Sequence, residues 1–180
     1  RVFITNDLDT ILPKWLRFIQ GVLDTTSLDL NVSRELIQSS PVLEKIKKAI
    51  TKRVILELKK AMKKDPKAYD TFWEQFGKVL KEGLYEDIEN REKVADIARV
   101  FSSKIDANIT LQEYVEAFAA EQKDIYYLAA DSLDQAKQSA HLEGFRARGI
   151  DVLLMTDPID TFWMSQMGKF KDFNFVSIVR

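Results

Sequence analysis

The spacing of apolar residues changes near residue 101, and this change restricts the chain to few kinds of fold. Between residues 40 and 100, apolar side chains recur every three or four positions, which is the period of an α-helix. After residue 101, short apolar and β-branched runs alternate with further helical segments. Helix-rich sequence followed by alternating strands and helices predicts the α/β fold class.

Two helices are expected in the helical half, each beginning with a cap residue followed by proline. Ser40-Pro41 and Asp65-Pro66 both match the preference for Ser or Asp at the N-cap and for Pro in the first turn. After Pro41, one face of the expected helix is apolar: Leu43, Ile46, Ile50, Val54, Leu58 and Ala61. Its opposite face is basic: Lys45, Lys47, Lys48, Lys52, Lys59, Lys60, Lys63 and Lys64. A further helical stretch carries Val94, Ile97, Ala98 and Phe101.

The second half of the chain predicts a three-layer unit. Thr110 and Glu113 form a capping-box pattern for a helix over residues 111–118. Three strands are expected over residues 125–130, 150–156 and 174–179, with helices over 132–148 and 158–168 between them. This order implies crossover connections and a mostly parallel sheet covered by helices.

The first forty residues complete the expected architecture. A strand is expected over residues 1–5, a helix around 12–23 and an ordered loop over 24–31. We therefore expect two αβα layered units, the first truncated at its N-terminus, joined by a helical connector. The predicted boundaries are 1–40, 41–100 and 101–180. Because the chain begins at Arg1 rather than Met, we also expect it to be a piece of a longer protein.

Composition excludes several functional classes. Lys and Arg number 27 against 28 Asp and Glu, so no domain-wide basic field for nucleic acid is expected. The absence of Cys and the single His exclude thiolate and multi-histidine metal sites, and we expect no metal. No apolar run reaches the roughly 20 residues that span a bilayer. We expect a soluble cytoplasmic protein without a membrane partner.

Familiar catalytic patterns are missing from the α/β half. The turns at residues 129–132 and 156–158 lack the glycines with which such folds bind a pyrophosphate. His141 falls inside a predicted helix with no nucleophile motif beside it, which favours a structural or surface histidine. The lysine face after Pro41 is interpreted as solvated, although it also suits nucleic acid or an acidic protein surface.

The last predicted helix combines a core stripe with two apolar residues outside it. Ile159, Trp163, Met167 and Phe170 cluster on one side at 100° per residue. Phe162 lies at the edge of that stripe and Met164 well off it, so both are expected to be exposed. Such residues suit a surface that binds apolar partners, or one that another domain covers.

Asn31, Arg34 and Gln38 are spaced three and four residues apart, which places them on one face of a helical turn. An arginine beside amide side chains is chemically suited to a γ-phosphate. The same residues also fit the capped start of an ordinary helix. Spacing alone leaves both interpretations open.

Longer motifs resemble the ninety-kilodalton heat-shock chaperones. The segment LDLNVSRELIQSSPVLEKIKK is similar to the catalytic-loop region of that family. The resemblance continues through YDTFWEQFGKVLKEGLYEDIENREKVADIARV and EAFAAEQKDIYYLAADSLDQAKQSAHLEGFRARGIDVLLMTDPIDTFWMSQM, which together cover most of the chain. The portion SAHLEGFRARGIDVLLMTDPID is similar to bacterial members.

The resemblance implies the middle domain of an ATP-driven homodimeric chaperone that holds unfolded or partly folded client proteins. ATP and Mg²⁺ would bind an absent N-terminal domain, and an absent C-terminal domain would dimerise. Arg34 would contact the γ-phosphate, with Asn31 and Gln38 supporting it, while Phe162 and Met164 would contact clients. The fragment alone would bind no cofactor and would not be an enzyme. The alternative is a protein-interaction module without a catalytic role.

Overall fold

The computed structural model describes residues 11–20 and 41–179 of the chain. The chain separates into two compact units, Arg1–Lys60 and Ala61–Arg180, and each is described by itself. The α/β class is confirmed by the elements below. The three-part division at residues 40 and 100 stays a prediction.

The first unit contains a short 3₁₀ turn, η2 (Lys14–Leu16), which buries Trp15 and Leu16. The sequence predicts a longer helix here. Instead, residues 13–19 are linked by three-residue backbone hydrogen bonds, Leu16 N to Pro13 O at 2.9 Å and Ile19 N to Leu16 O at 3.0 Å. In these bonds each carbonyl accepts from the N–H three residues later, whereas in an α-helix it accepts from the N–H four residues later. The turn at Lys14–Leu16 is therefore a 3₁₀ turn rather than an α-helix.

Two long helices follow, and the break between them lies where the second cap-and-proline pair predicts it. Helix α2 spans Pro41–Lys64 and helix α3 spans Pro66–Glu86. The Asp65 carboxylate accepts a hydrogen bond from Ala68 N at 3.2 Å, which caps α3, and Pro66 occupies its first position. The predicted cap at Ser40 lies outside the described residues.

A β-hairpin takes the place of the end of the predicted third helix. Helix α4 covers only Arg91–Ile97, and strands β1 (Val100–Ser102) and β2 (Ala107–Ile109) follow it. Ala98 already has extended dihedral angles, which ends the helix. The hairpin owes its stability to tertiary contacts, because the Ser102 hydroxyl donates to the distant Asp151 carboxylate at 2.6 Å.

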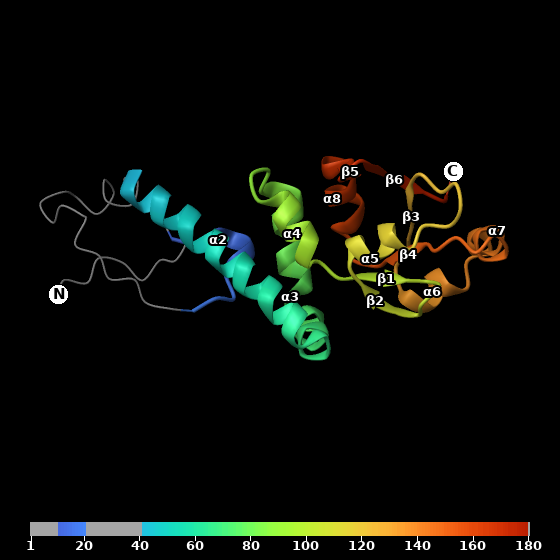
Figure 1. Ribbon diagram of the computed structural model, residues 1–180, viewed down its shortest axis with the longest axis horizontal. Helices are drawn as coiled ribbons and strands as arrows, with labels where there is room; N and C mark the ends of the chain where they lie inside the picture. The colour runs from blue at the N-terminus through green and yellow to red at the C-terminus, as the bar shows by residue number, and fades with distance from the viewer. Residues whose placement is uncertain (1–10, 21–40, 180) are drawn as a thin grey trace, which may run out of the picture. The chain divides into compact units, whose positions relative to one another are not determined.

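The remaining elements of the second unit are short helices and strands (Figure 1). They are α5 (Leu111–Glu116), β3 (Ile125–Ala129), α6 (Leu133–Lys137), η3 (Ala140–Leu142), α7 (Glu143–Ala147), β4 (Leu153–Met155), α8 (Asp160–Met167), β5 (Lys169–Phe170) and β6 (Phe173–Ser177). The predicted capping box is confirmed: Thr110 Oγ1 accepts from Glu113 N at 3.0 Å, and Glu113 Oε1 accepts from Thr110 N at 3.2 Å.

The helix predicted over 132–148 is broken into α6, η3 and α7. Ser139 adopts extended angles, and its hydroxyl accepts a hydrogen bond from His141 N at 3.2 Å. A serine that caps a new turn competes with continuation of the helix, because the cap requires non-helical angles at that residue. Gly149 ends the segment with a φ of 69°, in the left-handed region that a helix-terminating glycine adopts.

The strands form one sheet in the order β2-β1-β4-β3-β6-β5. Strand β3 is central and parallel to both β4 and β6, with Leu128 opposite Leu154 and Ile125 opposite Phe175. The three predicted strands are thus parallel neighbours, as expected. The outer pairs β1–β2, β1–β4 and β5–β6 are antiparallel, so the complete sheet is mixed.

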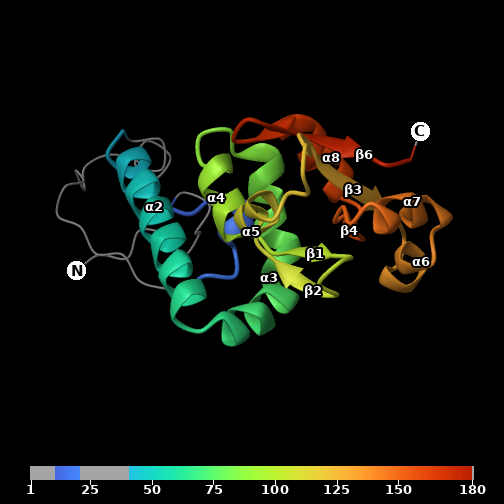
Figure 2. The same ribbon diagram turned by 45° about the vertical axis from the view of Figure 1, so that its right-hand side comes forward.

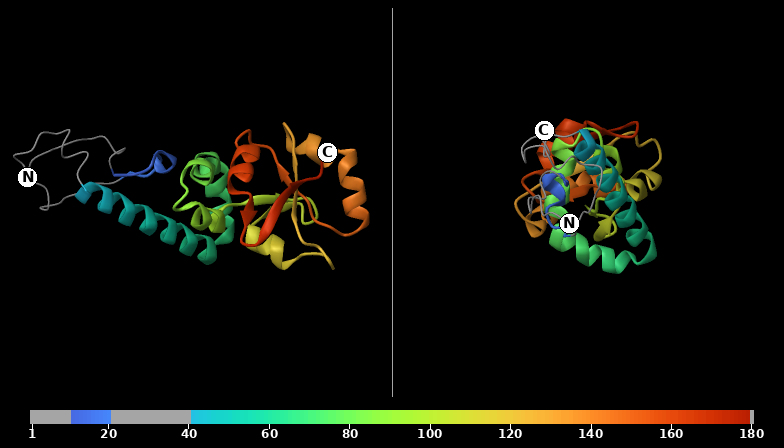
Figure 3. Two further views of the ribbon diagram at one scale, coloured as in Figure 1. Left: turned by 90° about the horizontal axis from the view of Figure 1, so that it is seen from above. Right: turned by 90° about the vertical axis from the view of Figure 1, so that its left-hand side faces the viewer.

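Helices cover both faces of this sheet. Leu128 and Leu154 share one face and pack with Ala136 and Leu142, which brings α6 and η3 onto that side. On the opposite face, the ring of Trp163 in α8 lies 5.4 Å from that of Phe175 in β6. Figure 2 and Figure 3 show α8 lying between the strands and helices α3 and α4. None of the described helices is long and apolar enough to cross a membrane.

Candidate functional site

Asn31, Arg34 and Gln38, which the sequence groups as one polar face, lie outside the described residues. The predicted residues of the last helix are described. The candidate site within the described residues is therefore the surface where α8 lies against α3.

Helix α8 buries one face and exposes Phe162. Trp163 and Met164 are almost fully buried, whereas 60% of the Phe162 surface is exposed. The expectation of an exposed Met164 is wrong. The predicted stripe began at Ile159, but this residue is the N-cap of α8 and, like Met167, is only partly buried. The buried residues of the helix are Asp160, Trp163 and Met164. Met164 belongs to that buried face and is therefore not exposed on the surface of the second unit.

Phe162 forms part of an exposed apolar surface with residues of α3 and its following turn. Its ring meets the ring of Tyr85 edge to face, with centroids 6.3 Å apart and planes inclined by 74°. Tyr85 is 40% exposed, and Ile88, three residues later, is 79% exposed. We refer to Tyr85, Ile88 and Phe162 as the apolar surface. Exposed side chains of this size in one region are typical of protein-interaction sites.

A buried ion cluster joins the same two helices. Lys81 Nζ lies 2.8 Å from Asp157 Oδ2 and 2.9 Å from Asp160 Oδ1. Lys81 precedes Tyr85 by one helical turn of α3, and Asp160 precedes Phe162 by two residues in α8. The ion cluster therefore fixes the segments that carry the two aromatic rings.

Asp160 is the most buried member of this cluster and contacts three neighbouring residues, Lys81, Trp163 and Asp157. Its side chain is fully buried, its Oδ1 also accepts from Trp163 Nε1 at 2.8 Å, and its Oδ2 accepts from Asp157 N at 2.9 Å. Burial by itself lowers the pKa of Lys81, but the carboxylates of Asp160 and Asp157 outweigh that effect and raise the pKa above its usual value. The amine therefore stays protonated at neutral pH.

A polar cleft of about 220 Å³ opens beside the cluster, between α3 and the end of β4. Lys78, Arg99, Asn108 and Thr156 contribute to its lining. Its charged groups largely neutralise one another: Lys81 faces two carboxylates, and Lys78 Nζ lies 4.0 Å from Asp157. Within the described residues, no group of three or more His, Asp or Glu side chains is arranged to hold a metal ion. The ion pairs beside the cleft are suited to holding α3 and α8 together rather than to acid–base chemistry.

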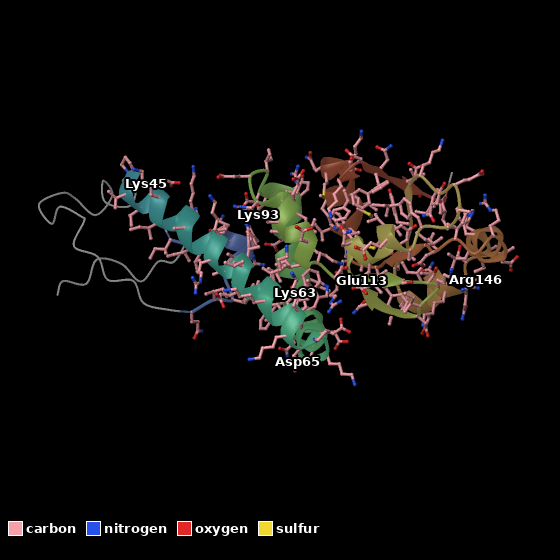
Figure 4. All side chains as sticks on the ribbon, viewed as in Figure 1. Lys45, Lys63, Asp65, Lys93, Glu113 and Arg146 are labelled. Carbon is pink, nitrogen blue, oxygen red and sulfur yellow. The ribbon has the colours of Figure 1, made fainter. Side chains whose placement is uncertain are left out.

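The remaining sequence candidates lie on exposed surface. His141 is exposed in η3, where only its backbone N–H takes part in the cap by Ser139. Lys45 and Lys63 lie near the two ends of α2 and are both exposed (Figure 4). In the same helix Arg53 Nε pairs with Glu57 at 3.0 Å, a solvent-exposed contact.

The ion cluster of Lys81, Asp157 and Asp160 is not predicted by the sequence pattern. The sequence contains one weak signal, the three-residue spacing of Asp157 and Asp160. At the start of a helix, an acidic side chain often accepts a hydrogen bond from the backbone N–H of the residue three positions earlier. Lys81 gave no such signal, because lysines on a helix are ordinarily solvated. Only the fold brings it beside the two aspartates.

Comparison with known proteins gives consistent matches over the whole length of the chain. The family model described as Hsp90 protein matches residues 1–180. The chain is 49% identical over 172 residues to the chaperone protein HtpG of Gluconobacter oxydans, covering 96% of this chain and 27% of that protein. Identity to the chaperone protein HtpG of Methylorubrum populi is 52% over 174 residues, covering 96% and 28%.

A solved structure extends the similarity to three dimensions. The middle domain of a heat-shock protein from Plasmodium falciparum superimposes with a TM-score of 0.83 at 29% identity. The match covers 96% of this chain and 68% of the other. The chain spans a little over a quarter of the length of the two HtpG relatives.

Proposed function

The chain belongs to the Hsp90 protein family, and we propose that it acts as the middle domain of a bacterial, ATP-dependent chaperone of the HtpG type. The observation that carries this proposal is the joint match of the family model and of a middle-domain structure over nearly the whole chain. We propose that the full-length protein is a cytoplasmic homodimer that acts in protein folding and in the stress response.

Arg34 is proposed to contact the γ-phosphate of ATP, with Asn31 and Gln38 ordering the loop around it. ATP and Mg²⁺ would be bound by an N-terminal domain, so this segment supplies one arginine to a site built elsewhere. Arginine suits that role because its charge is permanent and its planar guanidinium matches phosphate oxygens in pairs. The support is the LDLNVSRELIQ motif, which carries all three residues and resembles the catalytic-loop segment of the family.

The apolar surface is proposed to contact unfolded client proteins. Its support is geometric: Phe162 is held outward by a helix whose opposite face, Trp163 and Met164, is anchored in the core. A rigidly presented aromatic pair loses little conformational freedom when an apolar segment covers it. Clients would also meet other domains of the chaperone.

The Arg34 role is tested in a full-length chaperone that carries this segment. We expect Arg34→Ala to retain ATP binding and to lose about 10²–10³-fold in the rate of hydrolysis, the effect of removing one preorganised donor to a developing charge. Arg53→Ala is the matched control, because Arg53 makes only an exposed contact with Glu57 and should leave turnover unchanged. Unchanged turnover in Arg34→Ala would instead favour a protein-interaction module without a catalytic role.

A further inference from the structure

Acidic side chains border the apolar surface on its α3–α4 side. Residues 82–93 contain five Asp or Glu and two Lys or Arg. Glu86, the last residue of α3, and Glu89, in the turn that carries Ile88, are both exposed. Within the described part of the chain, neither carboxylate forms an ion pair. Two solvated negative charges therefore stand within a few residues of Tyr85 and Ile88.

The turn directs its other polar groups inward, which explains why these two carboxylates remain available. Arg91 Nε donates to Leu84 O at 2.6 Å, and its Nη2 donates to Tyr85 O at 2.8 Å, so its guanidinium closes the end of α3. The Asp87 carboxylate accepts from both the backbone N–H and the side-chain amide of Asn90, at 3.1 and 3.0 Å. The next basic residue along the chain after Arg91 is Lys93, which is exposed beside Glu92 in α4.

The position of Glu86 is unfavourable for the helix itself. The C-terminal end of a helix carries partial negative charge, so an acidic side chain there is less favourable than a basic one. The last turn of α3 contains no basic residue. The Arg91 guanidinium caps the last carbonyls of α3, but Glu86 itself adds nothing to the stability of the helix, and such a departure from a local rule is expected where a surface serves a function.

The α8 side of the apolar surface is uncharged. The exposed neighbours of Phe162 on that helix are Thr161, Ser165 and Gln166. The negative charge is therefore confined to one side of the Tyr85–Phe162 pair. This negative charge would attract segments that carry positive charge next to their apolar residues.

We propose that this surface selects client segments in which Lys or Arg residues stand next to an aromatic or aliphatic anchor. The anchor covers Phe162, Tyr85 and Ile88, and the basic residues face Glu86 and Glu89. This selection rests on the proposed client-binding function of the same surface. It adds the class of segment that binds there, which is basic and apolar rather than apolar alone.

The test uses two short unfolded peptides that share one apolar core, flanked by Lys in one and by Glu in the other, with affinities measured by fluorescence anisotropy. At low salt the Lys-flanked peptide should bind about three- to ten-fold more tightly, the sum of a few exposed ion pairs. The difference should shrink at high salt, because the pairs are solvent-exposed.

Variants assign the preference to named residues. The double variant Glu86→Gln/Glu89→Gln should abolish the difference between the two peptides. The control Glu121→Gln/Glu143→Gln removes the same charge from exposed sites elsewhere and should preserve it. Phe162→Ala should weaken the binding of both peptides.

The possible failures are distinguishable. If both peptides bind equally and both depend on Phe162, charge selection is overturned while the client surface stands. If the preference persists in Glu86→Gln/Glu89→Gln, it arises elsewhere and this assignment is overturned. If neither peptide depends on Phe162, the proposed client surface fails, and the selection fails with it.

Discussion

Lys81 of α3 and Asp160 of α8 form a buried ion pair, with 2.9 Å between Nζ and Oδ1. Both side chains are more than nine-tenths buried. Asp157, also in contact with Lys81, makes the group a triad with one cation and two carboxylates. The pair connects a helix near the middle of the chain with one near its end.

Removing the cation should destabilise the second unit. Lys81→Met leaves two carboxylates without their buried partner, and breaking such a pair costs about 3–5 kcal/mol in the free energy of unfolding. Lys78→Met is the matched control: Lys78 is exposed and lies 4.0 Å from Asp157, so its loss should cost less than about 1 kcal/mol. Urea denaturation of both variants measures the difference. Equal stability of the two would show that the triad does not hold α3 to α8.

Alkaline pH should lower the stability of the fold. Burial raises the pKa of Tyr69 and of Tyr114 well above their usual value of 10.0, and the carboxylates raise that of Lys81 above 10.5. Each protonated form is favoured by folding, so this contribution is complete below the unfolded pKa and is lost as pH rises through the folded one.

Denaturation at a series of pH values above about 10 checks this behaviour, since only there does the unfolded state release the protons first. Tyr114→Phe should weaken the dependence. It should also reduce stability by about 1–3 kcal/mol near neutral pH, because Tyr114 Oη donates to Asp151 O at 2.7 Å and accepts from Tyr126 N at 3.0 Å. A free energy of unfolding that stays flat across that range contradicts the assignment.

Phe162→Ala should separate stability from client binding. The side chain is mostly exposed and has one described ring neighbour, Tyr85, so its removal should change the free energy of unfolding by less than about 1 kcal/mol. Holding of an unfolded protein, measured as suppression of its aggregation, should weaken several-fold. Ile105→Ala, an exposed apolar residue in the β1–β2 turn, should leave holding unchanged. A large loss of stability in Phe162→Ala would place the residue in the core.

Gly77→Ala should loosen the packing of α3. A Cβ atom at Gly77 would stand 2.7 Å from the Trp73 indole, closer than carbon atoms approach without displacement. Because Trp73 is buried, its ring has little room to move, and we expect a loss of about 1–3 kcal/mol in the free energy of unfolding. Gly144→Ala, with open space around the new methyl group, is the control. Thermal denaturation that ranks Gly77→Ala as the more stable variant would contradict this reasoning.

Local signals in the sequence were sufficient for much of the fold. The caps at Asp65 and Thr110 act through residues three positions away, so a short motif contains all that they need. The parallel strands β3, β4 and β6 are buried, and buried strands have continuous apolar runs that stand out from their flanks. Exposure of Phe162 followed from its place at the edge of the helical stripe.

Features that depend on distant partners were not predictable. Strand β1 is three residues long and continues the apolar pattern of α4, and its identity as a strand comes from pairing with β4 and from the Ser102–Asp151 hydrogen bond. Met164 was misplaced because the core side of α8 includes the buried Asp160, whose partner Lys81 lies far away in the sequence, so the apolar residues alone indicate the wrong face. The Lys81–Asp160 pair joins residues far apart in the sequence, which no periodicity relates.

The edge strands of the sheet bear on the proposed contact with unfolded client proteins. Strands β2 and β5 form the two edges and contain only three and two residues. Edges this short give an extended polypeptide almost no backbone to pair with. An unfolded chain bound at the proposed client surface, Tyr85 and Phe162, would therefore be held through its side chains and would have little opportunity to extend the sheet. Its release would not require the separation of a paired strand.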